Sequence, residues 1–233
     1  GQTLKDRPEK RHEYIETCYE LGFSYIHANN PEQFMNELSA LRSIVEGTEA
    51  HPQLELFQAY LYVMAVTGAV QFINKDIQVD EDLLDEAREF VLAPERRRNM
   101  HLIQTILFML GVISLYKDAP KDALKYANHC YNTEDITRRT QLYLHLQFFR
   151  VLSAMLSDSW DFAEHTLNQL QYFVDKRSEH TERVKPYLKA FRAAMQHTNH
   201  DKLLDDIREV RKTVPTFPEA RFFDLDWLLH NNL

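Results

Sequence analysis

Residues 107–131 read LFMLGVISLYKDAPKDALKYANHCY, and this stretch decides the fold. Its apolar spacing predicts the end of one helix, a break at 118–120 around a proline, and then a second helix. Gly111 lies in the first predicted helix, whereas Ala123 and Ala127 lie four residues apart on one face of the second. A small residue on each partner lets two helices approach closely, so the stretch predicts a tightly packed helical hairpin.

Length and composition indicate that such helices fill the chain. It has 233 residues, of which 44% are hydrophobic, with only 5 Gly and 8 Pro. An all-β protein needs a turn roughly every 8–12 residues, so these few chain-breaking residues favour long helices. The apolar content is sufficient for a large core. We therefore predict an all-α fold in a single domain over residues 1–233.

Five helical hairpins and a C-terminal helix are predicted along the chain. The hairpins cover residues 9–46, 53–92, 97–132, 136–175 and 182–213, and the C-terminal helix covers 218–232. Ala123, Ala163 and Leu203 occupy equivalent places 40 residues apart, which indicates a true repeat. Hairpins of this kind stack into an α-α superhelix, or solenoid, whose open end the last helix would cap.

Two segments carry a signature that can be compared with known repeats. The pattern Leu21-Gly22-x-x-Tyr25 has a second copy at Leu110-Gly111, with Ala123 following in the next helix. This pattern resembles tetratricopeptide (TPR) repeats, and residues 160–170 are similar to the second helix of such a repeat. The TPR period is about 34 residues, whereas the spacing here is 40 or more, and HEAT-like helix pairs with periods of about 40–47 are the alternative architecture.

Motifs that mark enzymes are absent from the sequence. It contains no GxGxxG, GxxxxGK[ST], GxSxG or HExxH, and we predict a non-catalytic protein with no cofactor and no metal site. His197, His200 and Asp201 are interpreted as a polar loop rather than metal ligands. The acidic residues between Asp76 and Asp85 are interpreted as a solvated loop, because they lack the glycine and closing glutamate of a calcium loop.

The net charge and the cysteines indicate which partners and which cellular compartment to expect. The formal net charge is −8, which makes nucleic acid an unlikely partner because phosphate binding needs positive charge. Cys18 and Cys130 are interpreted as free buried thiols, which favours a cytoplasmic protein. No apolar run approaches the ~18 residues that a membrane span needs. We interpret Gly1 as a cleavage scar, which predicts a fragment of a longer protein.

One candidate surface is the inner face of the first helix of each hairpin. The predicted registers place seven residues there: Phe108, Val112, Tyr116, His145, Phe148, Leu152 and Arg192. The resemblance to TPR arrays implies that this concave face holds a peptide. The alternative interpretation is that the apolar stripe belongs to the core. The oligomeric state stays open.

The second candidate surface is a basic edge. Arg96, Arg97 and Arg98 open the first helix of the third hairpin, and Arg138 and Arg139 open that of the fourth. Positive charge opposes the dipole at a helix N-terminus, so this pattern indicates an anionic partner. The alternative interpretation is that nearby acidic residues neutralise the edge.

The leading hypothesis is therefore a non-catalytic scaffold that binds a protein or peptide on the concave face of a TPR-like array. One alternative is a sensor or assembly domain of a larger transcriptional regulator. Another is a solenoid that binds an anion or nucleic acid through the arginine-rich edge.

Overall fold

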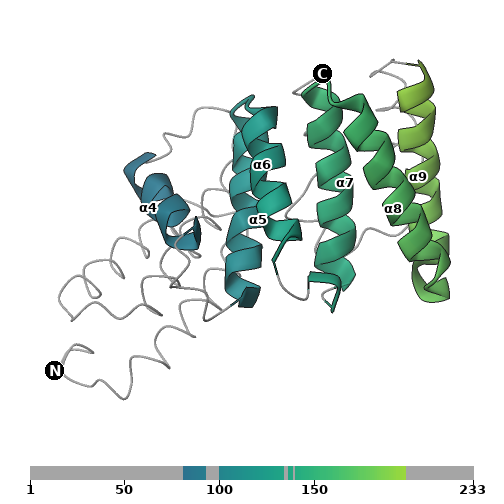
Figure 1. Cartoon of the computed structure of the whole chain (residues 1–233), viewed down its shortest axis with the longest axis horizontal. Coiled ribbons are helices and arrows are strands. Elements are labelled where there is room, and N and C mark those ends of the chain that lie inside the picture. Colours follow the sequence, from purple (N-terminus) through teal and green to yellow (C-terminus); the bar gives the residue numbers. More distant parts are fainter. Residues whose placement is uncertain (1–80, 93–99, 134–135, 139, 198–233) are drawn as a thin grey trace, which may run out of the picture. The chain divides into compact units, whose positions relative to one another are not determined.

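The computed structural model describes residues 81–92, 100–133, 136–138 and 140–197, and all of the regular structure in these ranges is helical (Figure 1). In chain order the elements are α4 (Glu81–Leu92), α5 (Met100–Tyr116), α6 (Pro120–Tyr131), the short 3-10 helix η4 (Ile136–Arg138), α7 (Thr140–Leu156), α8 (Trp160–Asp175) and α9 (Ser178–His197). The predicted all-α class is therefore confirmed for these residues. The first predicted hairpin, the first helix of the second, the second helix of the fifth and the C-terminal helix at 218–232 lie outside them.

The chain divides into two compact units, residues 1–110 and 111–233, with the boundary inside α5. In the first unit, α4 buries Leu84, Ala87 and Val91, whose spacing of three and four residues gives the helix one apolar face. On its other face Arg88 pairs with Asp85. A single domain over the whole chain remains a prediction.

Helices of the second unit pack in chain order. α6 packs on α7, α7 on α8, and α8 on α9, while η4 packs on α7 (Figure 1). Each helix therefore contacts its sequence neighbours, which is the packing that a repeat array requires. None of the described helices combines the length and the apolar character that crossing a membrane requires.

The 40-residue repeat is visible in two turns. The α5–α6 turn places Asp118 at φ 56°, and the α7–α8 turn places Asp158 at φ 57°. In the first turn the Ala119 N–H donates to the Ser114 carbonyl at 2.9 Å, and the Ser159 N–H repeats this bond in the second turn at 2.8 Å. This pattern is a Schellman motif, which ends a helix with one left-handed residue. The predicted break at 118–120 is confirmed.

Gly111 permits a close approach between helices of the second unit. A Cβ atom at this position would lie 2.9 Å from Cε1 of Phe149 on α7 and 3.4 Å from the Ala123 carbonyl oxygen on α6. Both neighbours are fully buried, so there is little room for either to retreat. The small residues of the opening stretch are thus required where α5, α6 and α7 meet.

Candidate functional site

Most residues of the predicted inner face are buried. Phe108, Val112, Phe148 and Leu152 are buried, His145 is 9% exposed, Tyr116 is half-buried and Arg192 is exposed. The reason is clear for Phe148, whose ring lies 5.8 Å from that of Tyr187 and 5.5 Å from that of Phe191 on α9. α9 therefore covers this part of α7, and the burial favours the core interpretation of the stripe.

The predicted basic edge is described at one position. Arg138 ends η4 and is exposed. Arg96, Arg97, Arg98 and Arg139 lie outside the described residues. The edge therefore remains a prediction.

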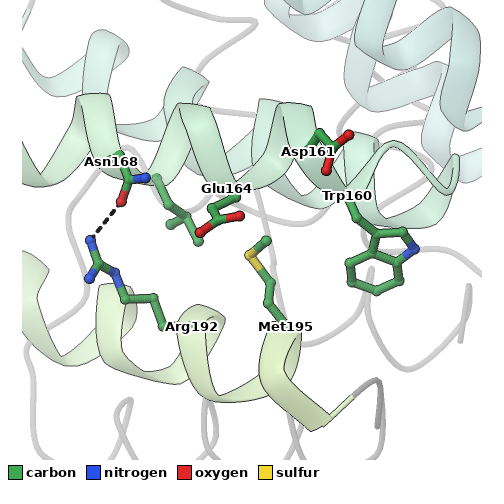
Figure 2. Close-up of a pocket in the computed structure, with 7 residues that line it drawn as sticks. Trp160, Asp161, Glu164, Asn168, Arg192 and Met195 are labelled. Carbon is green, nitrogen blue, oxygen red and sulfur yellow. Dashed lines mark hydrogen bonds between the residues drawn. The ribbon is translucent and has the colours of Figure 1, made fainter.

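An open pocket lies between α8 and α9 (Figure 2). Its volume is about 350 Å³, and we call it the α8–α9 pocket. α8 contributes one face of its first two turns, and α9 contributes two residues three apart. The lining residues are Trp160, Asp161, Glu164, Leu167, Asn168, Arg192 and Met195. Arg192 is the one member of the predicted inner face among them.

The packing of α8 explains which residues line the pocket. Ala163, Leu170 and Val174 are fully buried against the neighbouring helices, so the polar residues between them turn outward. Leu167 is also buried and forms an apolar floor. Half-buried Met195 lines the pocket from α9 (Figure 2). The pocket thus has an apolar floor and a polar rim, which is the usual construction of a recognition site.

Charge is divided along the pocket. At one end Nη2 of Arg192 donates to Oδ1 of Asn168 at 3.1 Å. Toward the other end lie the exposed carboxylates of Asp161 and Glu164, which make no hydrogen bond or ion pair within the described ranges. Asn168 lies seven positions after Asp161, so the two ends lie about 10 Å apart along α8. The pocket therefore presents separated anionic and cationic ends.

A second polar group lies inside the second unit, around Arg150 of α7. This side chain is only 5% exposed. Its Nε donates to Oδ1 of Asn128 on α6 at 2.9 Å, and its Nη1 donates to Oε1 of Gln147 at 2.6 Å. The guanidinium lies 3.9 Å from the ring centre of Tyr131. Amide oxygens and an aromatic face thus surround this cation, and no carboxylate within the described residues pairs with it.

Tyr143 extends this network, which we call the Arg150 cluster: Asn128, Tyr131, Tyr143, Gln147 and Arg150. Nε2 of Gln147 donates to the Tyr143 hydroxyl at 2.9 Å, and the Tyr143 ring lies 4.3 Å from that of Phe173 on α8. Burial lowers the pKa of Arg150 and raises the pKa of Tyr143, because it disfavours the charged form of each. The cluster joins α6 and α7 and contacts Phe173 of α8, so we interpret it as a packing element of the second unit.

Six of the seven pocket residues were not identified from the sequence. Trp160, Asp161 and Glu164 begin a helix, where such residues usually signify only a helix start. A signal nevertheless exists in the repeat. Asn168 lies 40 residues after Asn128, and the Phe-Arg pair that ends with Arg150 recurs at the pair that ends with Arg192. Aligning these two copies of the repeat would have predicted the Asn–Arg link.

Comparison with protein-family models, curated proteins and solved structures found no match for this chain. Within the described ranges, no three His, Cys, Asp or Glu side chains come together in a way that could hold a metal ion. Cys130 is a buried free thiol. His197, His200 and Asp201 lie outside the side chains that the structure describes.

Proposed function

We propose that this protein is a non-catalytic scaffold that binds a segment of another protein, and that the α8–α9 pocket is a docking point for that segment. The observation that carries the proposal is the pocket itself. Its floor is apolar, and its two carboxylates are unpaired within the described residues. Open concave surfaces between stacked helices are where repeat arrays bind extended partners.

Exposure of the carboxylates favours recognition over catalysis. Asp161 and Glu164 are both exposed on α8, and the pocket is open to solvent. Reaction centres generally exclude water, because exclusion strengthens the electrostatic interactions that lower the barrier. A carboxylate in an open pocket is better suited to meeting a cationic group of a partner.

The helical packing supports the same proposal. Consecutive pairing of α6 to α9 gives a scaffold whose surface can change residue by residue while its core stays the same. The resemblance to TPR repeats fits this role. The inner-face stripe supports it less, because most of its described members pack in the core.

Peptide display tests the proposal directly. A random dodecapeptide library on phage would be selected against the immobilised chain, and the Kd of each enriched peptide would be measured by fluorescence polarisation. Trp160→Ala removes the largest side chain of the pocket rim, and we expect it to weaken binding at least about tenfold, because aromatic residues dominate binding energy at such sites.

Tyr172→Ala is the matched control. Tyr172 is a large aromatic residue on the same helix, is 64% exposed and does not line the pocket. We expect this variant to bind within about twofold of the parent, because exposed residues outside a site contribute little. Failure to enrich any peptide, or equal losses in both variants, would contradict the proposal.

A further inference from the structure

The second unit contains two hydrogen-bonded Asn–Arg links, Asn128–Arg150 and Asn168–Arg192. They differ in the further hydrogen-bond acceptors around the arginine. Arg150 has Asn128 Oδ1 as one acceptor and Gln147 Oε1, three residues earlier in α7, as a second. Arg192 has Asn168 Oδ1 as its acceptor, but the residue three positions earlier in α9 is Lys189. Lysine carries only donors, so it cannot replace the glutamine.

The aromatic ring that lies over Arg150 also has no counterpart over Arg192 among the described residues. Tyr131 lies over the Arg150 guanidinium, whereas the residue 40 positions after Tyr131 is Gln171, whose amide donates instead to Asp175 at 2.8 Å. Among the described residues, Arg192 makes no other hydrogen bond or ion pair. The remaining donors of Arg192 are therefore available to an acceptor from outside, and a carboxylate matches the guanidinium geometry best.

The opposite end of the pocket has the complementary chemistry. Asp161 and Glu164 lie three residues apart, so they share a face of α8. Their negative charges repel each other, which favours a cation near both. Trp160 also lines the pocket, and its indole can add a cation–π interaction (Figure 2). The stem of a lysine or arginine would pack on Leu167 and Met195 while its charge reaches the rim.

Spacing then selects the form of the partner. The place for the partner's cation, at Asp161, and the place for its carboxylate, at Arg192, are about 10 Å apart along α8. The separation of Asp161 and Asn168 gives this distance. In a polyproline II helix, residues three apart share a face and are about 9 Å apart. In an α-helix the same three residues cover only about 4.5 Å, so an α-helical partner with this short spacing fits less well.

We infer that the α8–α9 pocket binds an extended, polyproline II segment in which a Lys or Arg is followed or preceded at three residues by an Asp or Glu. The basic side chain lies at Trp160, Asp161 and Glu164, and the acidic side chain binds Arg192. This inference rests on the proposed function and specifies its partner.

Defined peptides test the spacing. The probe is the acetylated and amidated hexapeptide Pro-Lys-Pro-Pro-Glu-Pro, and the control is Pro-Pro-Lys-Glu-Pro-Pro, which has the same composition with adjacent charges. Binding is followed through the indole N–H signal of Trp160 by NMR, in a chain carrying Trp227→Phe, because the protein has 2 Trp. We expect the spaced probe to bind at least about fivefold more tightly than the control.

Charge reversal tests the assignment of the two ends. Arg192→Glu should weaken the Lys-Pro-Pro-Glu probe and strengthen a Lys-Pro-Pro-Lys probe, each by at least about fivefold, because the sign of one end is reversed. Asp161→Asn combined with Glu164→Gln should weaken both probes. All of these side chains are exposed, so circular dichroism should show an unchanged fold.

Results that overturn the inference are distinct from those that overturn the proposed function. Equal affinity for spaced and adjacent charges, or an Arg192→Glu variant with unchanged preference, would reject the charge-spaced segment. If library peptides sensitive to Trp160→Ala were enriched without this charge pattern, the docking function would stand and only the inference would fall. If no library peptide were enriched at all, the function itself would fail.

Discussion

The α6–α7 and α8–α9 contacts contain the same Asn–Arg link in different surroundings. Asn128 and Arg150 are joined inside the second unit, where the guanidinium is 5% exposed. Asn168 and Arg192 are joined at the surface, where both side chains are exposed. The difference lies in their neighbours, because Tyr131 covers the first link and nothing equivalent among the described residues covers the second. The same link can therefore be enclosed in one copy of the repeat and open to solvent in the next.

The enclosed link has an energetic consequence. A buried cation loses its hydration, and Arg150 recovers part of that loss through two hydrogen bonds and the Tyr131 ring. Removing the arginine would leave the oxygens of Asn128 and Gln147 without their donor. The exposed link loses little hydration and leaves nothing buried when it is removed. Substitutions at the two arginines should therefore affect stability to different extents.

Arg150→Ala is the change with the largest expected effect. It should lower the free energy of unfolding by about 3 kcal/mol, because it creates a cavity and leaves the buried acceptor of Gln147 and the half-buried acceptor of Asn128 unpaired. Arg192→Ala should change it by less than about 0.5 kcal/mol, because that side chain is exposed. Guanidinium chloride denaturation of the two variants and the parent gives both values. Equal losses would show that the two links do not differ in the way described.

Arg150→Met separates packing from charge within the same comparison. Methionine keeps the aliphatic stem and removes the buried charge, so the loss should be smaller than for alanine. A loss as large as that of Arg150→Ala would indicate that the hydrogen bonds to Asn128 and Gln147 carry the stability rather than the packing.

The second prediction concerns Gly111 of α5, whose counterpart 40 residues later lies on the equivalent helix α7. Gly111→Ala gains about 1 kcal/mol of helix propensity, but its Cβ would lie 2.9 Å from the Phe149 ring. Overpacking in a core costs about 1–3 kcal/mol, so we expect a net loss of about 1 kcal/mol in the free energy of unfolding. At the position 40 residues later α7 has Val151, fully buried, so the close approach belongs to one copy only.

Phe149→Leu provides the control for Gly111→Ala. A smaller side chain at position 149 should make room for the added methyl group, so the double variant should lose less stability than the sum of the two single variants. Additive losses would mean that the Phe149 ring is not the obstacle.

The hairpin pattern could be predicted from the sequence because it depends on local chemistry. Gly111, Pro120 and Ala123 lie in one short stretch, and the 40-residue spacing is a pattern of the sequence itself. The described residues form helices where these features predict them. The exposure of the inner-face stripe could not be predicted in the same way. Whether Phe148 faces solvent depends on whether α9 reaches it, and that is a tertiary contact.

The α8–α9 pocket could not be predicted from the sequence for a related reason. A periodic pattern identifies which face of α8 is buried, but a hollow requires that α9 be placed so that Arg192 and Met195 lie opposite Glu164. The burial of Arg150 could not be predicted from the sequence either. Arginine is usually exposed, and the partners Asn128 and Tyr131 are about 20 residues away in sequence. Polar residues whose role depends on distant partners are those that sequence periodicity misassigns.

The smallest expected effect is a dependence of stability on alkaline pH at Tyr143. Burial raises the pKa of this phenol above the ordinary value of 10.0, while the hydrogen bond from Gln147 acts in the opposite direction and is outweighed. Above pH 10 the unfolded chain loses the Tyr143 proton first, so its stabilising contribution is complete below that pH and declines as the pH rises through the folded pKa. Urea denaturation between about pH 9 and 11 should therefore show a steeper decline for the parent than for Tyr143→Phe.

The difference between the parent and Tyr143→Phe isolates the buried group from the other tyrosines. The protein has 11 Tyr, and most of their titration is common to the parent and each variant, so it cancels in the difference. Because the charge of Arg150 lowers the pKa of Tyr143, Arg150→Met should raise that pKa further and steepen the alkaline decline. An unchanged slope in Arg150→Met would mean that the two groups of the Arg150 cluster do not interact electrostatically.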